Sequence, residues 1–288
     1  MSIDKLQEKI RKLKNPTVVD LTVSASLLPP QLLEQEGSVV KAWGKYALEL
    51  MEGLKGIVPA VRFNFSAFAL MGGEGIDLLN FLMNRAKEFG FYVLLDSVEA
   101  LSYQSAETAA GELLGWNCDG LVVSSYIGTD GVKPYVQRLK ESGKTLFVVL
   151  RTANKTAPEL QDLMTGSRLV YMAAADMVNR LGESLPSKCG YNQVAGVGPA
   201  SSADSLRALR TKYKNIFLLV EGYDYPNANA KNCSYAFDKL GHGAAVCAGS
   251  TITGAWKEEN ANTEDYAQAA VQAAERMKKN LTRYTTVL

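Results

Sequence analysis

Eight short apolar runs, spaced along the chain with helix-like stretches between them, constrain the fold more than any other feature of the sequence. The runs are apolar throughout, as strands buried on both faces of a parallel sheet are. They lie at Thr17–Leu21, Val58–Asn64, Phe91–Asp96, Gly120–Ser124, Thr145–Arg151, Gln193–Val197, Asn215–Glu221 and Gly243–Cys247. Alternation of strands and helices predicts an α/β fold with a parallel sheet, and a count of eight favours a closed (β/α)8 barrel.

The stretches between the runs place apolar residues at helical spacing. They lie at Gly75–Phe89, Ser105–Leu114, Val132–Ser142, Ala203–Tyr213 and Glu264–Leu281. Residues 1–14 predict an extra helix before the first strand, and residues 15–288 supply the barrel. No linker rich in Pro, Gly or Ser divides the chain, so we expect one domain over residues 1–288.

Composition excludes several classes of function. The 31 basic and 30 acidic residues give a net charge of +1, which provides no electrostatic reason to expect nucleic acid or a membrane as partner. The four cysteines form no C-x-x-C pair, which argues against a disulfide framework or a zinc site. His242 is the single histidine, so a multi-histidine metal centre is excluded, and we expect neither a metal nor a cofactor. A structural or surface role is expected for His242, and Cys247 is expected to be a small buried hydrophobe.

The sequence also predicts a compartment. No apolar run approaches the roughly 18 residues that a membrane span needs. The amino-terminal segment is charged and lacks the apolar core of a signal peptide, so we expect a cytoplasmic protein.

Polar residues gather where the predicted strands end, which is where (β/α)8 barrels carry their chemistry. These residues are Asp20, Arg62, Asn64, Asp96, Ser124, Ser125, Arg151, Glu221 and Cys247. Arg62 and Arg151 could together hold a carboxylate or phosphate, because a guanidinium offers forked donors. The carboxylates of Asp20, Asp96 and Glu221 could bind a hard cation, or they could pair with the two arginines. Structural pairing and ligand binding both remain open.

Two loops add weaker signals. The polar, turn-rich segment Tyr223–Lys231 follows the seventh predicted strand and could act as a mobile lid. The glycine-containing segment 125–131 leads into a helix whose amino terminus could bind an anion.

Three segments resemble the orotidine 5′-phosphate decarboxylase family, lyases of pyrimidine biosynthesis, and specifically its longer bacterial branch. Gly143–Leu163 is similar to the family's R-T-S-N-P-S-S…Q-D-L pattern, and Val122–Tyr135 and Pro59–Ile76 resemble two further family segments. The residues that match the first pattern are Arg151, Thr152, Asn154, Gln161 and Asp162. The resemblance runs from about Asn15 to Met277 and implies a (β/α)8 barrel that forms a homodimer with sites at the subunit interface.

The chain departs from the family's catalytic motif, D-x-K-x-x-D-I-x-x-T. Asp96 retains the first aspartate, but the lysine falls at Val98, the second aspartate at Leu101 and the threonine at Ser105. In the family, that lysine protonates the carbanion left when carbon dioxide departs, and valine has no proton to give.

The substrate-binding positions depart as well. The lysine of the second strand becomes Arg62, the aspartate of the first strand becomes Thr22, and the Asn-Pro pair after the fourth strand becomes Ser124-Ser125. The family's phosphate-binding glutamine aligns with Pro226, and its phosphate-binding arginine aligns with Ser250. Because such groups each supply several kcal/mol of transition-state stabilisation, we do not expect ordinary decarboxylation of orotidylate.

Two readings follow from these observations. The first, which we favour, is a non-catalytic relative with a structural, regulatory or binding role. The second is a lyase-like enzyme with a rebuilt strand-end site for an acidic or phosphorylated small molecule, since one fold hosts many chemistries. The candidate catalytic residues are Asp96, Arg62, Asp20 and Glu221, and the candidate ligand-binding residues are Arg151, Thr152, Asn64, Ser124 and Ser105. The expected partners are a small anionic ligand and a second copy of the chain.

Overall fold

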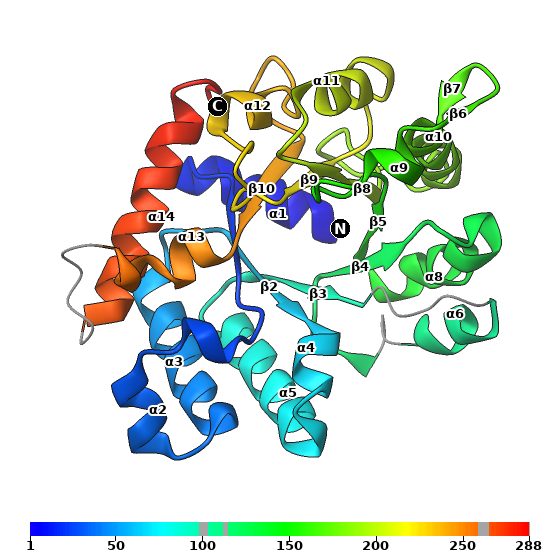
Figure 1. The fold of residues 1–288 in the computed structure, drawn as a ribbon. Helices are drawn as coiled ribbons and strands as arrows, with labels where there is room; N and C mark the ends of the chain where they lie inside the picture. Colours follow the sequence, from blue (N-terminus) through cyan, green and yellow to red (C-terminus); the bar gives the residue numbers. More distant parts are fainter. Residues whose placement is uncertain (98–102, 112–114, 259–264, 288) are drawn as a thin grey trace.

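In the computed structural model, which describes residues 1–97, 103–111, 115–258 and 265–287, eight parallel strands close into a barrel ringed by helices (Figure 1). The strands are β1 (Thr17–Asp20), β2 (Ala60–Asn64), β3 (Tyr92–Asp96), β4 (Gly120–Ser124), β5 (Thr145–Val149), β8 (Val194–Pro199), β9 (Leu218–Glu221) and β10 (Ala244–Ala248). Their order around the barrel is β1-β10-β9-β8-β5-β4-β3-β2. The predicted (β/α)8 barrel is confirmed, and each predicted strand overlaps one barrel strand.

Most of the helices lie between successive strands and outside the barrel. The described helices are α1 (Ser2–Leu13), α2 (Pro30–Glu36), α3 (Val39–Leu54), α4 (Phe65–Ala69), α5 (Gly72–Glu88), α6 (Tyr103–Ala109), α8 (Gly128–Ser142), α9 (Pro158–Gln161), α10 (Val170–Gly182), α11 (Ala203–Lys212), α12 (Ala230–Ser234), α13 (Ser250–Thr253) and α14 (Tyr266–Thr282). Helix α1 precedes the first strand, whereas α13 and α14 follow the last. Two short 3-10 helices, η1 (Ala25–Leu27) and η2 (Ala255–Lys257), and a hairpin of β6 (Met164–Thr165) and β7 (Arg168–Leu169) complete the described elements.

The sequence reading anticipated some of these helices and omitted others. The five predicted stretches overlap α5, α6, α8, α11 and α14, although residues 112–114 of one stretch and residue 264 of another lie outside the described residues. The prediction omitted the long helices α3 and α10. Helix α10 begins with the apolar run Val170–Ala175, and its polar residues Asp176, Asn179 and Arg180 lie only in its second half, so its first turns show no polar face.

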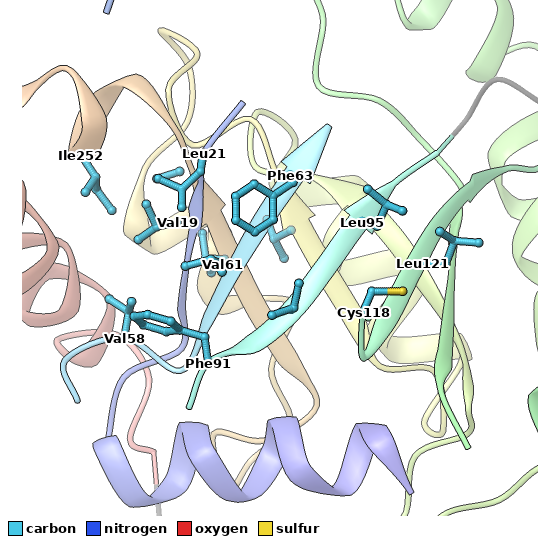
Figure 2. Close-up of a cluster of buried hydrophobic side chains, with 14 of the residues drawn as sticks. Val19, Leu21, Val58, Val61, Phe63, Phe91, Leu95, Cys118, Leu121 and Ile252 are labelled. Carbon is cyan, nitrogen blue, oxygen red and sulfur yellow. The ribbon is translucent and has the colours of Figure 1, made fainter. Parts of the chain in front are cut away.

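Two apolar layers hold the barrel together, because successive side chains of a strand point to opposite faces. Val19 of β1 and Val61 of β2 belong to a cluster that also contains Trp43 and Leu50 of α3. Figure 2 shows both valines together with Leu95 of β3. Val18 and Ala60, one residue earlier on the same strands, belong instead to a separate cluster inside the barrel. This alternation fixes which strand-end residues point into the mouth of the barrel.

Helix α1 packs against the interior of the barrel. In Figure 2 it crosses below the amino-terminal ends of the strands. Its residues Ile3, Leu6 and Ile10 are fully buried and belong to the interior cluster. Ser2 donates hydrogen bonds to the hydroxyl of Tyr92 at 2.8 Å and to the carbonyl of Asp119 at 2.6 Å. The predicted extra helix therefore closes the face of the barrel opposite the carboxyl ends of the strands.

Within the described residues, each helix is too short or too polar to span a membrane.

Candidate functional site

Four charged side chains meet at the mouth of the barrel. Asp20 ends β1, Arg62 lies near the end of β2, Asp96 ends β3 and Glu221 ends β9. Strand register aligns Asp20 with Arg62 across the β1–β2 pair. Each of these residues follows an inward-facing neighbour two positions earlier on its strand, so all four side chains turn toward the barrel axis. We call Asp20, Arg62, Asp96 and Glu221 the mouth cluster.

Arg62 ion-pairs with all three carboxylates of the mouth cluster. Its Nη1 lies 3.1 Å from Oδ2 of Asp20, and its Nη2 lies 3.1 Å from Oε1 of Glu221. The same Nη2 donates to Oδ2 of Asp96, which also accepts from Nδ2 of Asn64 at 2.9 Å. The cluster therefore sets three carboxyl groups against one guanidinium. Of the two alternatives left open by the sequence, pairing among strand-end charges is the arrangement present.

Burial sets the ionisation of this cluster. Burial raises the pKa of Glu221 to about 6, because the opposing attraction of Arg62 is smaller and Asp96 and Asp20 add repulsion. Burial acts to lower the pKa of Arg62, but the three carboxylates hold it well above its ordinary value. Burial also raises the pKa of the Cys247 thiol well above its usual range, which agrees with the predicted role of a small buried side chain. With this pKa, Glu221 can change charge near neutral pH.

The carboxylates of the mouth cluster do not form a metal site. Within residues that the structure describes, no group of three or more His, Cys, Asp or Glu side chains is placed to hold a metal ion. Arg62 contacts each carboxylate directly, so a guanidinium occupies the position that a bound cation would need. The suggestion that these residues bind a hard cation is therefore not supported.

Arg151 pairs with Asp162 and not with a carboxylate of the mouth cluster. Its Nε donates to Oδ1 of Asp162 at 2.7 Å, and its Nη2 donates to Oδ2 at 2.8 Å. Its side chain is only 7% exposed. The structure thus gives Arg62 and Arg151 separate carboxylate partners and does not bring the two arginines to a common ligand.

The remaining predicted ligand-binding residues lie in three places. The backbone N–H of Thr152 donates to Oε1 of Gln161 at 2.8 Å, within the loop that follows β5. Ser124 ends β4, and its Oγ accepts the backbone N–H of Tyr126 at 3.1 Å. Ser105 is half-buried in α6. Val98 and Leu101, which align with the family's catalytic lysine and aspartate, lie outside the described residues.

Asp224 is a feature that sequence reasoning missed. Its carboxylate accepts the backbone N–H of Gly249 at 2.8 Å and that of Thr251 at 2.7 Å, at the start of α13. Barrels of this fold often bind phosphate with a short helix that follows the last strands. Asp224, which lies in the predicted loop Tyr223–Lys231, thus binds with its own carboxylate the backbone N–H groups at the start of α13. The sequence signal that could have indicated this role is the position of Asp224, three residues after β9 ends at Glu221.

His242 lies at the other end of the barrel, before β10. It is half-buried, and its backbone N–H donates to Oδ1 of Asp238 at 2.9 Å. This position is remote from the carboxyl ends of the strands, which fits the structural or surface role expected for it.

Comparison with known proteins identifies relatives that span the whole barrel. No protein-family model matches the chain. Orotidine 5′-phosphate decarboxylase of Rhodopirellula baltica is 28% identical over 285 residues, which cover 93% of this chain and 94% of the relative. The Clostridium kluyveri protein of the same name is 26% identical over 98% of this chain and 97% of its own length.

Solved structures agree on the fold. A Toxoplasma gondii protein assigned as an orotidine-monophosphate decarboxylase superposes with a TM-score of 0.80 at 20% identity, covering 98% of both chains. Leishmania donovani OMP decarboxylase gives a TM-score of 0.73 at 20% identity, covering 97% of this chain and 99% of that one. Over nearly its full length the sequence is thus similar to orotidine 5′-phosphate decarboxylases at 23–28% identity, and its closed eight-stranded barrel matches the fold of these solved structures.

Proposed function

We propose that this chain is an orotidine 5′-phosphate decarboxylase-like barrel that does not decarboxylate orotidine 5′-monophosphate and instead has a non-catalytic binding, structural or regulatory role. The mouth cluster carries the proposal. Its one cation, Arg62, is engaged by Asp20, Asp96 and Glu221, and within the described residues no lysine ion-pairs with these carboxylates. A departing carboxylate would leave a carbanion facing an excess of negative charge.

The sequence alignment and the α13 region support the same proposal. Valine at position 98 stands where the family has the lysine that protonates the carbanion. At the start of α13, the carboxylate of Asp224 already accepts two backbone N–H groups that an anionic phosphate would otherwise need. A phosphate placed there would meet a like charge, which disfavours a nucleotide monophosphate.

A rebuilt catalytic site is the second candidate, and Glu221 is the observation that favours it. A buried carboxyl group with a pKa of about 6 can both accept and release a proton near neutral pH. On this alternative, Glu221 would act as the acid or base of a lyase-like reaction, and Arg62 would position it.

The decisive experiment is an assay of carbon dioxide release from carboxyl-labelled orotidine 5′-monophosphate, with the Rhodopirellula baltica relative assayed in parallel. We expect no measurable turnover by this chain and weak or absent binding of uridine 5′-monophosphate by calorimetry. A turnover rate within about a hundredfold of the relative would overturn the proposal, since that gap is under about 3 kcal/mol of activation free energy.

We also propose that the chain forms a homodimer, as the family resemblance implies. Leu163 and Met164, at the start of the β6–β7 hairpin, are 52% and 65% exposed and offer an apolar surface. Sedimentation analysis should give twice the chain mass, and Leu163→Glu should shift the protein toward the monomer. A wild-type protein that sediments as a monomer at micromolar concentration would contradict this part of the proposal.

A further inference from the structure

A cavity of about 450 Å³ opens beside the mouth of the barrel, between the ends of β4 and β5 and helix α10. Its volume lies in the range of small-ligand pockets, and it lies at the end of the barrel where this fold binds ligands. We propose that this cavity binds an uncharged, largely apolar small molecule that carries a hydrogen-bond acceptor. The proposal rests on the binding role proposed above and names the chemistry of its ligand.

The apolar character comes from both the barrel and α10. The aliphatic side chains that line the cavity come from β5 and the residue after it, from α9 and from α10. The larger ones are those of Val149, Leu150, Leu160, Val170 and Met177, and two alanines of α10 also line the cavity. Leu160 and Tyr126, which also lines the cavity, are 49% and 75% exposed. A ligand seated in the cavity would remove apolar surface from water, at roughly 25 cal/mol for each Å².

The cavity offers no charge to a ligand. None of the residues that line it is Asp, Glu, Lys, Arg or His. Arg151 directly precedes the lining residue Thr152, but its Nε and Nη2 donate to Asp162 and its Nη1 donates to the carbonyl of Thr152 at 3.3 Å. A charged ligand would lose its hydration here without gaining a counter-charge, which is costly. The lining therefore selects against phosphorylated and carboxylated molecules.

Two polar side chains that line the cavity retain a hydrogen-bond donor for a ligand. Ser124 Oγ accepts the N–H of Tyr126, and its own hydroxyl proton has no acceptor among the residues that the structure describes. Gln161 donates one amide hydrogen to Oγ1 of Thr152 at 2.8 Å, and within the described part of the chain the other has no acceptor. The hydroxyl of Ser125, by contrast, already donates to the carbonyl of Val149 at 2.6 Å. Ser124 and Gln161 therefore suit a ligand with a carbonyl or other neutral acceptor.

A matched pair of fluorescent probes tests the charge and polarity of the cavity. N-phenyl-1-naphthylamine is neutral, and 1-anilinonaphthalene-8-sulfonate adds a sulfonate to the same ring framework. We expect the neutral probe to bind saturably, with one site per chain, and at least about tenfold more tightly than the sulfonate. Equal or tighter binding of the sulfonate, or no saturable binding of the neutral probe, would overturn the proposal.

Substitutions that fill the cavity locate the site. Ala174→Leu should weaken binding of the neutral probe by about tenfold or more, and Ala173→Leu, at a second lining position, should do the same. Ala69→Leu is the matched control, because Ala69 is exposed at the end of α4 and does not line the cavity. Circular dichroism confirms that each variant is folded. Unchanged affinity in both folded cavity variants would overturn the assignment.

The acceptor preference has its own test. A neutral ketone analogue of the probe, such as phenyl naphthyl ketone, should displace the bound probe, and Ser124→Ala should weaken the ketone more than it weakens the probe. If Ser124→Ala weakened binding of both compounds equally, the proposed hydrogen bond from Ser124 to a ligand acceptor would be wrong. These experiments use no nucleotide, so their failure is distinguishable from unexpected decarboxylase activity, which would overturn the proposed function while leaving the cavity result unchanged.

Discussion

Arg151 and Asp162 form a two-point ion pair, with Nε 2.7 Å from Oδ1 and Nη2 2.8 Å from Oδ2, which joins the end of β5 to the end of α9. Such a planar pair fixes geometry as well as charge. It orders the loop that forms one wall of the cavity, and it explains how an arginine at a strand end can be structural. The side chain of Asp162 is 31% exposed, so the pair is only partly screened from water.

Asp162→Asn should lower the free energy of unfolding by about 1–3 kcal/mol, because it leaves the buried guanidinium of Arg151 without its counter-charge. Urea denaturation measures the change. The hydrogen bond from Arg151 lowers the pKa of Asp162, so the stabilisation is present above the unfolded value of about 3.9 and is lost as the pH falls through the lower folded pKa. Asp204→Asn is the control, because Asp204 is 93% exposed. Equal effects of the two variants would show that the pair contributes nothing.

Arg62→Met should be more destabilising, by about 3–5 kcal/mol, since it leaves three carboxyl groups at the mouth without their shared cation. The side chain of Arg62 is 13% exposed and that of Asp96 is 6% exposed, so water cannot replace the guanidinium fully. Arg276→Met provides the matched control, because the pair of Arg276 with Glu258 is at the surface and should contribute at most about 1 kcal/mol. A stability of Arg62→Met equal to wild type would refute the account of the mouth cluster.

Glu221 should make stability depend on pH between about 4.5 and 6. Burial raises its folded pKa to about 6 from an ordinary value of 4.5, so the folded state binds the proton more tightly than the unfolded state does. The stability contributed by protonated Glu221 is complete below pH 4.5 and is lost as the pH rises through 6, a change of about 2 kcal/mol.

The comparison of wild type with Glu221→Gln isolates this effect, because the amide cannot titrate. Chemical denaturation at several pH values should show the wild type losing stability relative to the variant as the pH rises. Glu159→Gln, at an exposed position of α9, should retain the wild-type profile. Parallel wild-type and Glu221→Gln profiles across this window would rule out a raised pKa.

Helix α1 should be essential for stability. Leu6→Ala should cost about 2–5 kcal/mol, because Leu6 is fully buried against the interior of the barrel and its truncation leaves a cavity. Lys5→Ala, one residue earlier and exposed, should change stability by less than about 0.5 kcal/mol. Thermal unfolding measures both, and a similar melting temperature for the two variants would mean that α1 does not close the barrel.

The sequence determined the barrel because its information is local. A strand buried on both faces must be apolar along its whole length, and the run Gly120–Ser124 coincides with β4 from end to end. The same apolar runs also predicted that Asp20, Arg62, Asp96 and Glu221 lie at or near strand ends. Helix α10 was not predicted because its first turns, Val170–Ala175, are apolar all round and its polar residues begin only at Asp176.

Tertiary structure alone decided which partners those residues have. Strands β1, β2, β3 and β9 are distant in sequence, and only closure of the barrel brings Glu221 to the same guanidinium as Asp20. The same holds for Asp224, which reaches the start of α13 across a loop, and for the cavity, which needs α10 to cover the ends of β4 and β5. Side-chain periodicity is a property of one strand, whereas an ion pair or a cavity is a property of elements that meet in space.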